Sequence, residues 1–180
     1  MFLWERYANS PKGGLPEGSV LPDLRRGAGQ EPGSAPAMWK HYSRLDDHGR
    51  LTRELWAEHL CLVAFGIHQQ GKPRLVHSET GASLGEALRL LRAANTYSEE
   101  ALDRRVLQLA TADQPEEIAT HLLSLIRMLR GCPTVGELNY TSLFHDLVGL
   151  RYEDRAPRVR RRWGSAYHRK SKSPNTQKEA

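Results

Sequence analysis

Helical patterns follow one another almost without interruption from residue 52 to residue 150. In this part of the chain, apolar residues recur at intervals of three and four, the spacing that places them on one face of an α-helix. The only stretch with strand character, Arg74 to His77, is too short to build a sheet. We therefore predict an all-α fold, a compact helical bundle of six to eight helices arranged as two small lobes.

Residues typical of helix starts mark the boundaries of these patterns. The segment from Thr52 to His68 has a wide apolar face and predicts a central buried helix. Four later helices are expected to begin at polar residues, whose side chains can accept a hydrogen bond from the first helical turn. These expected capping residues are Ser83 with Glu86, Ser98, Asp113 with Glu116, and either Asn139 or Thr141.

The N-terminal part has a different composition. Between Pro11 and Pro36, eleven of twenty-six residues are Gly or Pro, which predicts a loop interrupted by at most a short helix from Leu21 to Arg26. Four parts are then expected along the chain: an N-terminal segment with a Gly/Pro-rich basic loop (1–36), an N-terminal helical lobe (37–96), a C-terminal helical lobe ending in a basic helix (97–170), and a disordered tail (171–180).

Positive charge is concentrated near the C-terminus. Residues 151–172 include nine Lys or Arg and two carboxylates, a formal charge of +7, whereas the whole chain carries +5. This pattern predicts a terminal helix that neutralises the phosphates of a polyanion. A charge run that is merely solvated is the alternative, because such runs are common near chain ends.

The predicted terminal helix has one apolar stripe and several cationic positions. Val159, Trp163, Ala166 and Tyr167 fall on one side of a helical wheel, so this side should dock on the core. Trp163 and Tyr167 are expected to be core anchors rather than platforms for stacked bases. The candidate anion-binding residues flank the stripe or point away from it: Arg158, Arg161 and Arg162.

Five further arginines are candidate nucleic-acid contacts. Arg25 and Arg26 lie on a turn bounded by glycine, where both guanidiniums could meet phosphates or simply be solvated. Arg105 falls at the edge of the buried face of its helix and is expected to pair with a carboxylate or a phosphate. Arg127 projects from a polar face, and Arg130 lies near a helix C-terminus, where it could instead complement the helix dipole. All eight candidate arginines are expected to line one continuous positive groove.

Motifs for catalysis are lacking. The sequence has no HExxH, phosphate-binding P-loop, GxSxG or paired-cysteine motif, and its eight histidines are scattered. The dipeptide His145-Asp146 resembles the metal-binding pair of HD phosphohydrolases, but the accompanying ligands have no recognisable context. We therefore expect no enzymatic activity, no cofactor and no bound metal.

The cysteines and the apolar stretches of the sequence indicate where the protein is expected to function. Cys61 and Cys132 give no disulfide framework, and Cys61 lies in an apolar run where a buried role is expected. No stretch approaches the roughly eighteen apolar residues of a membrane span, and charged residues follow the first apolar trio too closely for a signal peptide. These features predict a cytoplasmic protein with no membrane partner.

Four short segments resemble, in order and spacing, the CasB family, the small subunit of the type I-E CRISPR surveillance complex Cascade. They are LRRGAG, SLGEAL, DRRVLQLATAD and RVRRRWGSAYHR, and the resemblance covers roughly residues 20–170. Matching positions are the basic pair Arg25 and Arg26, the acidic-Arg-Arg element Asp103, Arg104 and Arg105, and the aromatics Trp163 and Tyr167. The chain departs from the family at Tyr140 and Leu150, where many members have Trp.

The resemblance implies a non-catalytic, two-lobed helical protein that lies as a head-to-tail dimer in the complex. Its implied partners are the crRNA and target DNA backbone, including the displaced single strand, the Cascade backbone and large subunits, and a second copy of itself. Two rival hypotheses remain open. Residues 87–105 resemble the helix-turn-helix of a DNA-binding transcriptional regulator, and a purely protein-binding scaffold would turn the basic helix toward acidic neighbours.

Overall fold

The computed structural model describes residues 1–10 and 14–169, and within these ranges the regular structure is helical apart from one short strand. Its elements are α1 (Leu3–Ala8), α2 (Val20–Arg26), the 3-10 helix η1 (Pro36–His41), α3 (Arg53–Gln69), β1 (His77–Ala82), α4 (Leu84–Ala93), α5 (Glu99–Thr111), α6 (Pro115–Gly131), α7 (Tyr140–Leu150) and α8 (Ala156–Tyr167). The predicted all-α fold is confirmed. The division into lobes stays a prediction, and the predicted tail lies outside the described residues.

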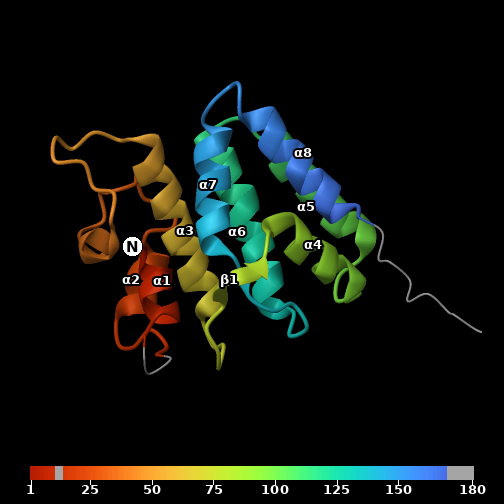
Figure 1. Ribbon diagram of the computed structural model, residues 1–180, viewed down its shortest axis with the longest axis horizontal. Helices are drawn as coiled ribbons and strands as arrows, with labels where there is room; N and C mark the ends of the chain where they lie inside the picture. The colour runs from red at the N-terminus through yellow and green to blue at the C-terminus, as the bar shows by residue number, and fades with distance from the viewer. Residues whose placement is uncertain (11–13, 170–180) are drawn as a thin grey trace, which may run out of the picture.

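Helix α3 is the centre of the bundle (Figure 1). It packs against α2 on one side and against α6 and α7 on the other. Every residue from Leu55 to Gln69 is buried, and the Thr52 hydroxyl caps the helix by accepting the Leu55 N–H at 3.0 Å. The central buried helix predicted from the apolar face of this segment is therefore confirmed.

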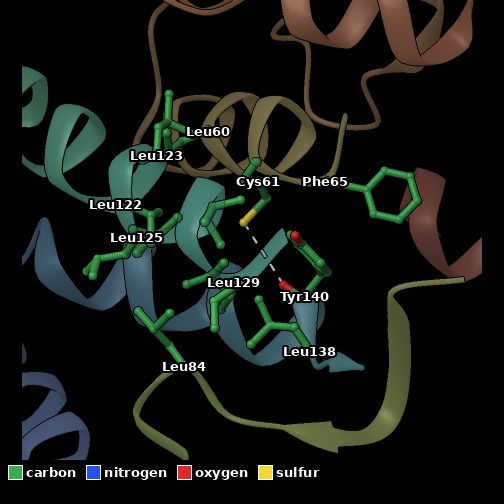
Figure 2. Packing of buried hydrophobic residues seen from close by; sticks show 14 of the residues in the cluster. Leu60, Cys61, Phe65, Leu84, Leu122, Leu123, Leu125, Leu129, Leu138 and Tyr140 are labelled. Carbon is green, nitrogen blue, oxygen red and sulfur yellow. Dashed lines mark hydrogen bonds between the residues drawn. The ribbon is translucent and has the colours of Figure 1, made fainter. Parts of the chain in front are cut away.

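The main core lies where α3 meets α6 and α7 (Figure 2). Leucines from α6, among them Leu122 and Leu125, pack below Cys61 of α3, and Tyr140 of α7 closes the cluster. Cys61 is fully buried, as predicted, with its thiol 4.0 Å from the carbonyl oxygen of Tyr140. Burial also raises the pKa of the Cys61 thiol, so this cysteine acts as a small apolar side chain.

Three of the four predicted helix caps are present. Ser83 and Glu86 form a reciprocal capping box at α4, with distances of 3.1 and 3.5 Å. Ser98 accepts the Ala101 N–H at 3.3 Å, and Asn139 accepts the Ser142 N–H at 2.7 Å. These local signals place the starts of α4, α5 and α7 correctly.

The predicted cap at Asp113 is wrong. Helix α6 begins at Pro115, so Gln114 is the N-cap residue, and its side chain makes no capping hydrogen bond. Asp113 lies one residue too early to cap and instead accepts a hydrogen bond from Arg160 of α8 at 2.5 Å. The carboxylate is therefore used for a long-range contact between the α5–α6 link and α8.

The strand also differs from expectation, because β1 begins at His77, where the predicted strand-like stretch ends. It pairs with the segment that precedes α7: the Leu138 N–H donates to the Val76 carbonyl, and the Asn139 N–H donates to the Ala82 carbonyl, both at 2.9 Å. The pairing holds α4 and α7 together at this edge of the bundle. In the described part of the chain, no helix is both long and apolar enough to span a bilayer.

Candidate nucleic-acid interface

Helix α8 is shorter than the cationic stretch in which it lies. Pro157 is in its first turn, which places Arg151 and Arg155 in the preceding turn rather than in one terminal helix. The lysines at 170 and 172 lie outside the described residues. The expected helix with a charge of +7 is thus corrected to a basic turn followed by a helix with four arginines.

The apolar stripe of α8 docks as predicted. Val159, Trp163, Ala166 and Tyr167 are all buried, and α8 packs on α4 and α7. The Trp163 indole N–H donates to Asp146 of α7 at 2.6 Å. Because Trp163 is 6% exposed, it is an anchor of the fold, and its ring is not available to stack on a base.

Tyr167 is the second anchor, and it explains the role of Asp103. Its hydroxyl donates to the Asp103 carboxylate, which also pairs with Arg92 of α4 at 3.2 Å. Burial, together with the Asp103 charge, raises the pKa of Tyr167, which keeps the phenol protonated as a donor. The acidic residue of the acidic-Arg-Arg element therefore joins α4, α5 and α8, a role that the sequence did not indicate.

Arg162 is not a free cation, contrary to expectation. It forms an ion pair with Asp146, a carboxylate that is 2% exposed, although half of the Arg162 side chain still faces solvent. Arg160, which was not a candidate, is likewise occupied by Asp113 and by the Ala112 carbonyl at 2.9 Å. On α8, Arg158 and Arg161 are exposed and have no carboxylate of the described residues within 4 Å.

The predicted basic pair lies at the end of α2. Arg26 donates to Asp23 at 3.1 Å, but its side chain is 69% exposed, so most of its donors remain open. Lys40 of η1 lies 3.0 Å from the same carboxylate and, through this contact, holds the pKa of Asp23 below its usual range. Arg25 is half-buried against α3, where its side chain approaches Gly66. The buried carboxylate of Asp23 thus holds Arg26 and Lys40 next to each other.

A neutral histidine fixes the turn that follows the basic pair. His59 Nε2 lies 3.0 Å from the Gly27 carbonyl oxygen, and His59 Nδ1 lies 2.6 Å from the Tyr42 hydroxyl. A carbonyl can only accept, so Nε2 carries the proton and Nδ1 accepts from Tyr42. Burial lowers the pKa of His59, which favours this neutral form. The sequence did not indicate this contact.

The three remaining candidates have different surroundings. Arg105 is half-buried and donates to the Ala101 carbonyl of its own helix at 3.0 Å. Arg130 donates to Gln70 at 2.7 Å, and Arg127 is exposed. None of these three has a carboxylate of the described residues within 4 Å, so of the two partners expected for Arg105, a carboxylate is not found among residues 1–10 and 14–169 and a phosphate stays a prediction.

The eight candidate arginines do not form one continuous groove. Helices α2 and α8 lie on opposite sides of the bundle, with α3, α6 and α7 between them (Figure 1). Arg25 and Arg26 are therefore separated from Arg158 and Arg161 by the width of the central helices. These four arginines therefore do not line one groove, and the expectation of a single groove is wrong for them.

The two residues of the HD dipeptide, His145 and Asp146, have different surroundings. Asp146 is buried with its two carboxylate oxygens engaged by Arg162 and Trp163, whereas His145 on the same helix is exposed. Across residues 1–10 and 14–169, no three His, Cys, Asp or Glu side chains are grouped so that they could hold a metal ion.

Comparison with known proteins gives one consistent result. The profile of the family described as CRISPR-associated protein Cse2 matches residues 20–168. The solved structure of CasB from Thermobifida fusca is 26% identical, with a TM-score of 0.65 over 92% of this chain and 91% of that one.

Two structures from Thermus thermophilus share the fold at lower identity. One, of a CRISPR-associated protein of the Cse2 family, is 21% identical, with a TM-score of 0.66, and the other, of CasB, is 20% identical, with a TM-score of 0.64. Each comparison covers 93% of this chain and 99% of the other. The curated proteins gave no match.

Proposed function

Since this chain belongs to the Cse2 family of CRISPR-associated proteins, also called CasB, and is therefore a Cascade subunit, we propose that it binds nucleic acid without reading its sequence. In this proposal it is the non-catalytic small subunit of a type I-E complex. It contacts the crRNA and the target DNA, including the displaced strand, by their phosphates. Membership of the family replaces the hypothesis of a transcriptional regulator.

The observation that carries the proposal is a set of guanidiniums left open to solvent on both sides of the bundle. Arg26 on α2, and Arg158 and Arg161 on α8, lie outside the buried stripes of their helices. Arginine binds phosphate through several N–H donors, and contacts of this kind carry no base information. The guide RNA would then supply sequence selection by base pairing.

Binding of the freed DNA strand would affect how readily the target duplex opens. Opening a DNA duplex against a guide RNA is close to neutral in free energy, so modest binding of the freed strand favours the open state. The proposed partners are accordingly the crRNA, the target strand, the displaced strand, the backbone and large subunits of Cascade, and a second copy arranged head to tail.

A pure scaffold remains the second candidate, and the ion pairs of Arg160 and Arg162 favour it. These two arginines are already matched by Asp113 and Asp146, so part of the positive charge of α8 serves the fold. A scaffold would assemble with its partners but would not bind free nucleic acid.

The test is titration of the full-length protein with labelled oligonucleotides at several salt concentrations. The double variant Arg158→Glu/Arg161→Glu should bind at least about tenfold more weakly, and its salt slope should fall by about 0.7 for each phosphate of a single strand that is no longer neutralised. The matched control is Lys72→Glu/Arg74→Glu, which changes the net charge equally away from both proposed surfaces. Equal weakening by both variants would indicate a general charge effect and argue against this interface.

A further inference from the structure

A pocket of about 760 Å³ lies between the turn after α2, the first half of α3 and the first half of α6. Its walls are largely apolar, formed by Trp56, Leu60, Val63, Ala119 and Leu123. The volume falls within the range of sites that hold small molecules or parts of larger ligands. The residues after Arg26, from Gly27 to Pro32, form one edge, so the pocket adjoins the basic pair.

Arginines from three elements surround this pocket. Arg53 of α3, Arg127 of α6 and Arg151 of the α7–α8 turn line it, and Arg155 follows in the same turn. Considering residues 1–10 and 14–169, these four guanidiniums have no carboxylate within 4 Å, in contrast to Arg26, Arg160 and Arg162. Glu31 and Glu116 also line the pocket, so the arginines exceed the lining carboxylates.

Aromatic rings contact three of these four cations. The Arg53 and Arg155 guanidiniums lie 4.2 and 4.5 Å from the centroid of the Tyr152 ring, and that of Arg151 lies 5.5 Å from the Trp56 ring. Arg53 and Arg155 are therefore closer together than the screening length of about 10 Å at 0.1 M salt. Contact with a ring does not consume the N–H donors of a guanidinium, so these donors remain available to an anion.

We propose that this pocket holds one unpaired nucleotide of a single strand. The base enters the apolar cavity, and the neighbouring phosphates bind Arg53, Arg127 and Arg151. The inference rests on the proposed function and deepens it by naming a site and a strand type. A phosphate backbone by itself would make no favourable contact with the apolar walls. A nucleotide offers both an apolar base face for these walls and a phosphate for the arginines.

The proposal predicts selectivity for unpaired strands. In a duplex the bases are stacked and paired, and entering the pocket would require one of them to be unpaired, unstacked and extruded, which costs free energy. In a single strand the base is already free. The pocket borders the turn after Arg26 and is also lined by Arg151 of the turn that precedes α8, so a strand that contacts both helices would pass near it.

The experiment compares an oligothymidine strand of about 20 nucleotides with a duplex of the same length. Ala119→Phe fills the pocket and keeps every arginine. It should weaken single-strand binding about tenfold and leave duplex binding unchanged. The control Thr111→Phe places the same ring on the exposed surface of α5 and should alter neither affinity. Melting temperatures establish that each variant is folded.

A second variant, Arg53→Gln/Arg151→Gln, keeps the proposal testable if Ala119→Phe does not fold. It should reduce single-strand affinity more than duplex affinity.

If either folded variant binds both ligands like the wild type, the pocket proposal is overturned while the proposed function stands. If these variants bind oligonucleotides normally but fail to assemble with Cascade subunits, the pocket is a protein site and the proposal is also overturned. If the wild type binds neither ligand, the proposed function itself fails, and this inference fails with it.

Discussion

Trp163 of α8 donates its indole N–H to the buried carboxylate of Asp146 on α7, with 2.6 Å between the two atoms. Arg162, the preceding residue, engages the other carboxylate oxygen. Two adjacent residues of one helix thus satisfy a single buried acid on the neighbouring helix. This contact fixes both the position and the rotation of α8, and through α8 the direction in which Arg158 and Arg161 point.

Removal of the Trp163 ring should therefore destabilise the whole fold. Trp163→Ala is expected to lower the free energy of unfolding by about 3–5 kcal/mol, because it leaves a cavity and an acid without its donor. Trp163→Phe keeps most of the apolar contact and should lose only about 1–3 kcal/mol. Urea unfolding monitored by circular dichroism measures both. Two equal losses would show that the hydrogen bond, rather than the ring, dominates.

Arg162 and Asp146 should behave as a coupled pair. Arg162→Gln is expected to cost about 1–2 kcal/mol, at the low end for a charged hydrogen bond because the guanidinium is half-exposed. In the double variant Asp146→Asn/Arg162→Gln the buried charge is gone, so the total loss should be smaller than the sum of the single losses. A double-mutant cycle in urea tests this. Additive losses would mean that the ion pair contributes nothing to stability.

Gly85 of α4 should tolerate no side chain. A Cβ atom at this position would lie 2.6 Å from the Trp163 carbonyl oxygen and 2.8 Å from the Ala166 Cβ, so α4 and α8 would have to move apart. We expect Gly85→Ala to lower stability by about 1–3 kcal/mol. Gly164 of α8 is the control, because a Cβ there meets no atom within 4 Å.

Gly164→Ala should stabilise the protein by about 0.5–1 kcal/mol through helix propensity. Thermal melting of the two variants beside the wild type compares them directly. An unaffected Gly85→Ala protein would contradict the close approach of the two helices, and a destabilised Gly164→Ala protein would contradict the open space at Gly164.

Stability should fall on acidification, and His68 should be one cause. Burial lowers the pKa of His68 to about 4, from an ordinary value of 6.5. The unfolded chain therefore binds the proton first as the pH falls, and this histidine lowers stability between pH 6.5 and about pH 4, by on the order of 3 kcal/mol in all. Above pH 6.5 both states are neutral and the effect vanishes.

The measurement is the free energy of unfolding across this pH range for His68→Gln and for the control His48→Gln, which alters an exposed histidine. His68→Gln should show a shallower loss of stability, whereas the control should follow the wild type. Parallel curves for all three proteins would rule out His68 as a source of acid sensitivity.

Features set by neighbours in the chain could be predicted from the sequence. The central helix, the caps at Ser83, Ser98 and Asn139, and the buried stripe of α8 all depend on residues within one or two helical turns. The family resemblance, carried by short segments in order, is confirmed by the match over residues 20–168. The predicted cap at Asp113 failed because α6 begins only at Pro115, and because Arg160, which is distant in the sequence, binds the Asp113 carboxylate.

Features set by contacts between distant segments could not be predicted. Periodicity places Arg162 beside a polar surface, but it does not reveal that Asp146 lies opposite. The fixed turn after α2 depends on His59, thirty-two residues away from Gly27. Arg53 and Arg151, which we propose as phosphate contacts, could not be predicted for the same reason, because they are far apart in the chain and both line the pocket only in the folded protein. The eight candidate nucleic-acid contacts stay predictions.

The placement of open arginines on opposite sides of the bundle has a consequence for the length of strand that one molecule can hold. A very short oligonucleotide can bind the arginines on only one side of the bundle, so the arginines on the other side do not increase its affinity. A strand long enough to span the bundle attaches twice, and the second attachment is intramolecular, with the high local concentration that tethering provides. Affinity should then rise steeply once a threshold length is passed, a form of avidity within a single small protein.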